Sequence, residues 1–126
     1  MGPKTRHLLG WVLAGLITAL LVITGIFKIR GGAEIEKNVV AMGFTMDVVK
    51  GIGIIELICA LFFIFPRTGV FGSMLVAAYM GGAIATHLQH NLPIGLPVLI
   101  ECLVFLSAVI RYPELLRRLV GTTVVV

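Results

Sequence analysis

Charged side chains are scarce in this sequence. Asp, Glu, Lys and Arg together make up 13% of its 126 residues, whereas apolar residues make up 59%. A soluble domain of this length does not have enough polar surface to cover so much apolar surface. With a mean hydropathy of +1.10, the composition excludes an ordinary soluble domain and predicts an integral membrane protein.

Cysteine is scarce as well, and the motifs of common catalytic sites are missing. Cys59 and Cys102 lie inside apolar runs without CxxC spacing, so we expect unreactive thiols rather than a disulfide or a redox pair. The sequence has no haem-attachment motif, glycine-rich phosphate loop or nucleophile motif. His87 and His90 have a metal-compatible spacing, but no carboxylate or cysteine stands beside them, so we expect no metal site.

Four apolar stretches approach or exceed the length of about 18 residues that a membrane-spanning helix requires. They cover about residues 8–29, 47–65, 69–88 and 93–112. A signal peptide is the alternative for the first, but the run is too long and "GGAEIEK" is a poor cleavage context. We therefore predict an all-α, integral membrane four-helix bundle that forms a single domain over residues 1–126.

The segment between the first two spans is different in kind. Ile35, Val39 and Met42 recur at helical spacing after the flexible Gly31-Gly32 pair, and charged residues lie opposite them. Such a stretch is amphipathic and too short to span, so we expect a helix on the membrane surface or folded against the bundle. A connector that shields the helix ends is favoured over a functional lid.

Basic residues near the ends of the spans predict the orientation. With four spans both termini share one side, which carries six Lys or Arg residues against four on the other side. This excess places both termini in the cytoplasm. The net charge of +4 therefore reflects topology and contact with anionic headgroups, and we expect no nucleic-acid partner.

Small residues are concentrated in the third span. Ala77 with Gly81, and Ala78 with Gly82, form small-xxx-small pairs. Helices in lipid associate through close backbone approach at small residues, so we expect these pairs to pack tightly against neighbouring helices. The polar run with His87 that follows lies at the interface, where the histidine is either a wetted terminal residue or part of a site.

Several motifs resemble the DoxX-like family of small four-span bacterial membrane proteins. They are the glutamate-bearing stretch "GIIELICALFFIFPRTGVFGSMLVAAYMGGAIATHL" (53–88), "GIFKI" (25–29) and the exit "RYPELLRRL" (111–119). The resemblance covers nearly the whole chain and implies a multi-pass protein of the bacterial plasma membrane. Members of the broader group are subunits linked to quinone-dependent oxidation of sulfur compounds or to membrane redox complexes, and more distant relatives are assembly chaperones or cargo receptors.

Two carboxylates lie deep within predicted spans. Glu56 follows Asp47 by nine residues and Glu101 follows Pro93 by eight, which places both roughly 12–14 Å below the same outer surface. Two carboxylates close together in a low dielectric do not both ionise, so the pair is a candidate for sharing a proton or a cation. The alternative is that each is a separate structural residue bonded to a hydroxyl or backbone group.

Two further residues belong to the candidate ligand-binding set. Lys28 ends the first span, where it either reaches down to the glutamates or extends up to the headgroups, and we favour the second. Together with Glu56, His87 and Glu101 it outlines an outward-opening polar pocket. The catalytic residues, if any, are not predicted.

Two functions follow from these observations. One is a quinone-linked or redox-accessory subunit, with quinone as the ligand. The other is a non-enzymatic membrane module, either an assembly chaperone or a binder or transporter of a small solute or cation. Both imply the lipid bilayer as surroundings, and a second copy or a membrane redox protein is the expected partner.

The apolar C-terminal segment "GTTVVV" (121–126) is expected either to dock against the bundle or another subunit or to be disordered.

Overall fold

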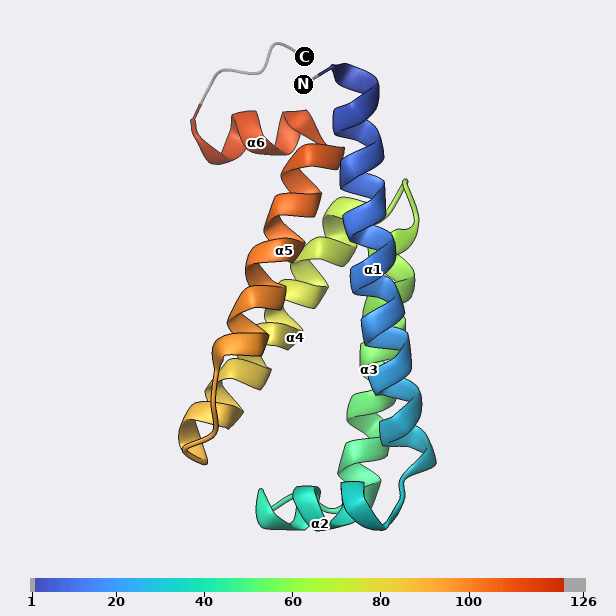
Figure 1. Cartoon of the computed structure of the whole chain (residues 1–126), viewed down its shortest axis with the longest axis vertical. Helices are drawn as coiled ribbons and strands as arrows, with labels where there is room; N and C mark the ends of the chain where they lie inside the picture. The colour runs from blue at the N-terminus through green and yellow to red at the C-terminus, as the bar shows by residue number, and fades with distance from the viewer. Residues whose placement is uncertain (1, 122–126) are drawn as a thin grey trace.

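The computed structural model describes residues 2–121, and every element in this range is helical (Figure 1). This confirms the predicted all-α fold. Residues 122–126, most of the predicted apolar tail, lie outside the described range. The helices are α1 (Pro3–Arg30), α2 (Ala33–Ala41), α3 (Met46–Ile64), α4 (Gly69–Gln89), α5 (Gly95–Arg111) and α6 (Pro113–Leu119).

The four long helices pack as a ring in which α1 and α4 each contact both α3 and α5. Figure 1 shows α1 and α5 close together at the end that carries α6 and diverging toward the end that carries α2. The short helices α2 and α6 lie across the two ends of this ring (Figure 1). The interior is therefore closed at the α6 end and wider at the α2 end.

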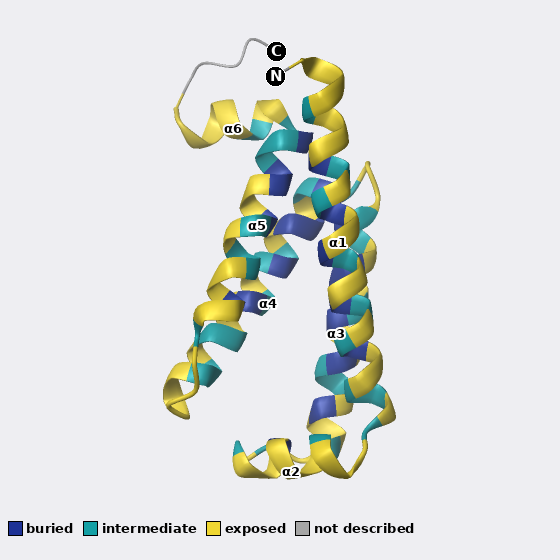
Figure 2. Cartoon of the chain, viewed as in Figure 1, coloured by how far each residue is buried: buried dark blue, intermediate teal, exposed yellow. Residues whose placement is uncertain are grey.

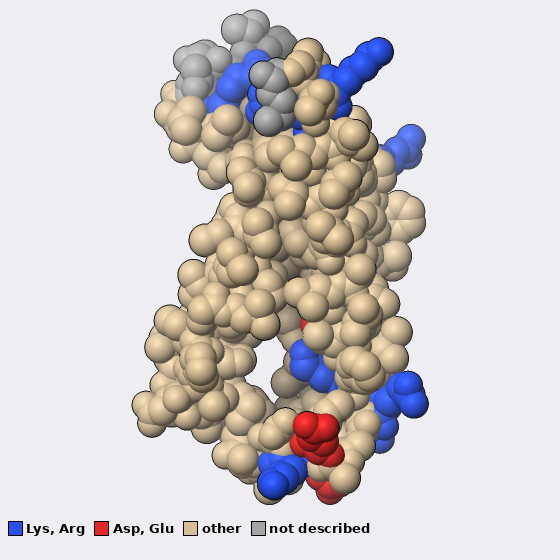
Figure 3. Space-filling model, viewed as in Figure 1, with Lys and Arg blue, Asp and Glu red and all other residues tan. Residues whose placement is uncertain are grey.

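The outer surface of the ring is apolar. Each of the four long helices exposes large hydrophobic side chains, for example Leu16 (65%), Met74 (67%) and Leu96 (64%). Figure 2 shows this exposed surface along the helices, and Figure 3 shows Lys, Arg, Asp and Glu gathered mainly toward the two ends. An apolar belt between charged ends is the pattern of a protein surrounded by lipid.

Helix lengths agree with membrane spans. Among the described residues, α1 and α4 are long and apolar enough to cross a membrane, and α5 with α6 forms a third candidate bent by 112°. Helix α3 has 19 residues and α5 has 17, or about 28 and 26 Å at 1.5 Å per residue. The α3 helix carries three charged residues, of which Glu56 is buried. Four spans remain the predicted topology.

The core of the ring is formed by apolar side chains from all four long helices. Ala14, Phe63, Val76 and Val104 from the four long helices are fully buried at 0% exposure. Figure 2 shows the buried residues facing inward on each helix. These four residues belong to one apolar cluster of the interior, together with Leu21, Cys59 and Met80.

The closest helix approaches lie elsewhere on α4 than predicted. A Cβ at Gly72 would overlap the backbone of Phe63, and a Cβ at Gly69 would overlap the Tyr112 hydroxyl. By contrast, Gly81 and Gly82 are exposed, and a Cβ at either would meet nothing within 4 Å. The prediction that these two glycines pack tightly is therefore wrong, because they lie on the exposed face of α4, opposite the face that lines the interior.

The amphipathic segment forms the predicted helix, α2. Gly31 and Gly32 precede it with positive φ angles of 71° and 143°, which glycine adopts without a steric penalty. They turn the chain sharply out of α1. Val39 is buried and Ile35 is half-buried, and α2 contacts α3. The segment is thus packed as a connector across the wide end of the bundle.

Candidate functional site

A cavity of about 390 Å³ occupies the interior of the wide end, where α1 and α5 diverge. Figure 3 shows the molecule hollowed between these helices, with basic side-chain atoms at the edge of the opening. Most of its wall is aliphatic, contributed by α1, α4, α5 and the turn before α5. The polar side chains that line it are Thr24, Lys28, Glu56, Tyr79 and His87.

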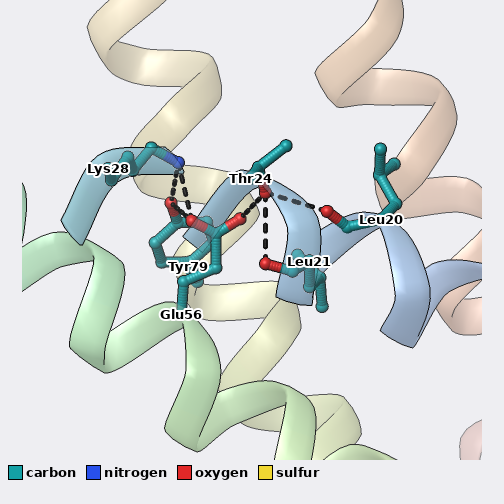
Figure 4. A network of polar contacts seen from close by, with 6 residues as sticks. All are labelled: Leu20, Leu21, Thr24, Lys28, Glu56 and Tyr79. Carbon is teal, nitrogen blue, oxygen red and sulfur yellow. Dashed lines mark hydrogen bonds and ion pairs between the residues drawn. The ribbon is translucent and has the colours of Figure 1, made fainter. Parts of the chain in front are cut away.

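Glu56 is the centre of the polar cluster (Figure 4). Its side chain comes from the middle of α3, and the residue is only 2% exposed. Oε2 accepts hydrogen bonds from Lys28 Nζ at 2.6 Å and from the Tyr79 hydroxyl at 3.0 Å. Oε1 accepts a hydrogen bond from the Thr24 hydroxyl. Both carboxylate oxygens are therefore satisfied within the protein, as a buried charge requires.

Lys28 reaches down to this carboxylate from the last turn of α1. Its Nζ lies 2.6 Å from Glu56 Oε2 and 2.9 Å from the Tyr79 hydroxyl oxygen. The ammonium also lies 5.6 Å from the centre of the Tyr79 ring, within the range of a cation–π contact. The favoured expectation that Lys28 only extends to the headgroups is therefore wrong. Extension toward water would leave a buried carboxylate without its counter-ion.

Two glycines bring the Lys28 and Glu56 backbones within reach of each other. A Cβ at Gly53 would lie 2.8 Å from the Gly25 carbonyl oxygen and 3.0 Å from Lys28 Cβ. Both glycines are buried at the crossing of α1 and α3. Because neither has a side chain, the two helices approach closely one turn away from Glu56.

Thr24 and Tyr79 are members of the cluster that sequence reasoning missed. Thr24 precedes Lys28 by four residues and so lies on the same face of α1. This four-residue spacing in the sequence could have predicted that Thr24 lies beside Lys28. Tyr79 lies within α4 among small and aliphatic residues, where a hydroxyl needs a partner. No feature of the sequence placed it opposite Glu56, since the two residues are on different helices.

His87 lines the same cavity from the last turn of α4. Its Nδ1 lies 2.7 Å from the Ala83 carbonyl oxygen. A carbonyl only accepts, so Nδ1 carries a proton and donates, which leaves Nε2 of the neutral ring as an acceptor. His90 is exposed, and its Nδ1 lies 2.9 Å from the Thr86 carbonyl oxygen. Only the first of the two histidines belongs to the cavity wall.

Glu101 is not brought into the cluster. It is half-buried on α5, it is not among the residues that line the cavity, and within residues 2–121 it forms no hydrogen bond or ion pair. Glu56 has Lys28 as its charge partner instead. Of the four predicted site residues, the structure thus gathers Lys28, Glu56 and His87.

The cysteines and potential metal ligands of the described residues do not form a cluster. Residues 2–121 contain no group of three or more His, Cys, Asp or Glu side chains that could hold a metal ion. Cys59 is a buried free thiol of the core, and Cys102 is an exposed free thiol on α5.

The cavity combines an apolar wall with a compact polar end. The Lys28–Glu56 pair is formally neutral, so the cavity does not require a charged ligand. An ammonium has three N–H donors, and two of those of Lys28 are directed to Glu56 and Tyr79. One donor remains for a ligand, and the cavity wall also carries the Nε2 acceptor of His87. Such a cavity suits a largely apolar molecule with a small polar head.

Comparison with known proteins supports one assignment. The profile of the DoxX-like family matches residues 12–110, a range that includes Lys28, Glu56, Tyr79 and His87. No curated protein and no solved structure matches the chain. The family match and the apolar helices together identify a membrane protein.

Proposed function

The chain belongs to the DoxX-like family, and we propose that its cavity binds the polar head of a lipid-soluble molecule of the quinone class. In this proposal the protein is an accessory subunit of a membrane redox system and presents or holds the quinone. The observation that carries the proposal is the position of the Lys28–Glu56–Tyr79 cluster at the polar end of an otherwise aliphatic cavity.

The dimensions and walls of the cavity suit such a ligand. A volume of about 390 Å³ lies within the range of roughly 300–1,000 Å³ that is usual for small-molecule sites. Leu20 and Leu21 of α1 and Leu96 and Ile100 of α5 are among the aliphatic residues that line the cavity. Figure 3 shows the molecule hollowed between α1 and α5, and in this proposal the hydrophobic tail of the ligand passes through that opening to the surrounding lipid.

Donor and acceptor groups are arranged for a quinone or a quinol. The remaining N–H of Lys28 is suited to donate to a ring oxygen, and Nε2 of His87 is suited to accept from a quinol hydroxyl. The Lys28 side chain is 31% exposed, so its ammonium is within reach of a ligand. Glu56, Tyr79 and Thr24 then act as positioning residues that hold the ammonium in place.

Transport of a cation or small solute is less well supported. Glu56 already has a bound counter-charge in Lys28, which removes the net negative charge that a cation site needs. Beyond the cluster, Phe63, Val76 and Val104 are fully buried and apolar. A polar solute crossing the bundle would have to displace this layer, so we favour binding over passage.

The proposal includes a location and an orientation. The protein lies in the plasma membrane of a bacterium with four spans and both termini in the cytoplasm. The α2 end and the cavity then belong to the outer half of the membrane. A redox partner that exchanges electrons with the bound quinone would approach from the lipid side or from the outer surface.

A paired histidine experiment tests the proposal. The full chain is reconstituted in phosphatidylcholine nanodiscs and titrated calorimetrically, without oxygen, with the reduced (quinol) form of a short-chain ubiquinone analogue. We expect His87→Leu, which removes the acceptor for the quinol hydroxyl, to raise the dissociation constant about tenfold, the effect of one lost hydrogen bond of about 1.4 kcal/mol. His90→Leu, at the exposed histidine three residues away, is the matched control and should bind as the parent protein does.

An alcohol with the same hydrocarbon tail but no quinol ring separates head recognition from simple partitioning. Weak binding of this alcohol to all three proteins supports a site for the quinol head. Equal affinity of the parent protein for the alcohol and the quinol, or equal affinity of the two histidine variants for the quinol, would overturn the proposal.

A further inference from the structure

At the opposite end of the bundle, Arg111 is a buried cation without a carboxylate partner. The residue is 6% exposed, and its Nη1 donates a hydrogen bond to the Phe63 carbonyl oxygen at 3.0 Å. Within residues 2–121, Nε and Nη2 have no hydrogen-bond partner and the side chain forms no salt bridge. A buried charge in this situation is only partly compensated.

Aromatic rings hold the guanidinium in place. Its central carbon lies 5.0 Å from the ring centre of Trp11, 4.5 Å from that of Phe63 and 5.2 Å from that of Tyr112. Cation–π contacts with the three rings stabilise the positive charge. Rings carry no net charge, however, so the field of the arginine persists in the low-dielectric surroundings.

This field acts on a hollow of about 410 Å³ at the bend between α5 and α6. Arg111, Tyr112, Leu115 and Arg118 contribute to its lining. The only acidic residue of this lining is Glu114, whose Oε1 lies 3.5 Å from Arg118 Nε. Both side chains of that pair are 62% exposed, and such a long, exposed pair contributes little. Arg118 is therefore available to turn toward an anion in the hollow.

The whole end of the molecule is basic. Lys4, Arg67 and Arg117 are exposed there in addition to Arg118, and Glu114 is the acidic residue of α6. Figure 3 shows blue side chains at this end of the space-filling view. The bend of 112° turns α6 across the end of the bundle, so the hollow lies where an interfacial helix meets lipid headgroups.

We propose that the hollow at the α5–α6 bend binds a phosphate-bearing anion, and that this anion is the headgroup of an anionic phospholipid. Arg118 makes the direct contact, Arg111 supplies a fixed positive field beneath it, and the aliphatic part of Leu115 borders the start of the acyl chains. A basic pocket beside membrane helices is a suitable site for such headgroups. This site is separate from the quinone cavity and does not depend on it.

The test compares two neighbouring arginines in nanodiscs. The thermal midpoint of the full chain is measured in phosphatidylcholine alone and with phosphatidylglycerol added. We expect the anionic lipid to raise the midpoint by several degrees, because a ligand that binds the folded state stabilises it. Arg118→Gln should lose most of this shift, and Arg117→Gln should keep it. Both variants remove one charge from α6, but only Arg118 lines the hollow.

Two outcomes would overturn the proposal. Equal shifts in both variants would mean that the lipid acts through the overall surface charge and not through the hollow. A shift produced by inorganic phosphate in pure phosphatidylcholine nanodiscs, and not by phosphatidylglycerol, would overturn the assignment to a lipid headgroup. The lipid-headgroup assignment is supported if phosphate leaves the thermal midpoint unchanged and if phosphatidylglycerol raises it in Arg117→Gln but not in Arg118→Gln.

Discussion

Lys28 Nζ and Glu56 Oε2 lie 2.6 Å apart across the contact between α1 and α3. The pair joins the first and second predicted spans at the point where Gly25 and Gly53 let their backbones approach. It also marks the polar end of the cavity. One interaction thus serves both the packing of two helices and the proposed binding of a polar head.

Breaking this pair should destabilise the bundle in a coupled manner. We expect Lys28→Gln and Glu56→Gln each to lower the free energy of unfolding, and the double variant to cost less than their sum. The coupling energy should be about 1–2 kcal/mol, because polar pairs within membrane bundles are weaker than their burial suggests. A double-mutant cycle of unfolding in mixed micelles measures it. A coupling energy near zero would mean that the pair does not form in the membrane.

The same cycle applied to Glu56 and Glu101 should give additive effects. Glu101 lies outside the cavity lining, so removal of one carboxylate should leave the environment of the other unchanged. We expect a coupling energy below about 0.5 kcal/mol, the usual range for separated sites. A larger coupling that changes between pH 5 and 9 would show that the two carboxylates share a proton after all.

Glycines on α4 should differ sharply in their tolerance of substitution. A Cβ at Gly72 would overlap the α3 backbone, whereas a Cβ at Gly82 would enter open space. Gly72→Ala should therefore cost about 1–3 kcal/mol through overpacking. Gly82→Ala should be neutral or slightly stabilising, because alanine is the better helix former. The thermal midpoints of the two variants in detergent measure this difference. Equal decreases in midpoint would contradict an α4 orientation in which Gly72 faces α3 and Gly82 is exposed.

The proposed topology predicts that the two ends of the bundle lie on opposite sides of the membrane. In a background lacking Cys59 and Cys102, a single cysteine at His90 should react with a membrane-impermeant maleimide in intact cells. A cysteine at Arg118 should react only after the cells are permeabilised. Both positions are exposed in the structure, so burial does not protect either one. External labelling at Arg118 would reverse the orientation.

The alternation of long apolar runs and charged breaks was sufficient to predict the four long helices, but not α6. The predicted spans of 8–29, 47–65, 69–88 and 93–112 correspond to α1, α3, α4 and α5 with ends that differ by a few residues. The amphipathic α2 followed from the spacing of Ile35 and Val39. These features depend on local composition and period, which act within a single segment of the chain.

Glu56 could be singled out from the sequence because an ionisable residue inside an apolar run must find a partner. Its partner could not be identified in the same way. Position along a helix follows from counting residues, so Glu56 and Glu101 have the same predicted depth. Which side of each helix faces the interior depends on the neighbours of that helix. Glu101 consequently lies away from the cavity, while Tyr79, which has no distinctive motif, lies in it.

The sequence by itself therefore determined the solvent of this protein, its four long helices and the amphipathic α2, and that Glu56 is an ionisable residue buried at a cost. Tertiary structure alone decided that Lys28 turns inward, that Gly72 and not Gly82 is the close contact of α4, and that Arg111 is enclosed by aromatic rings. The physical reason is that the residues of a segment themselves decide whether that segment enters the membrane as a helix. The rotation and spacing of helices are set by how all four pack together.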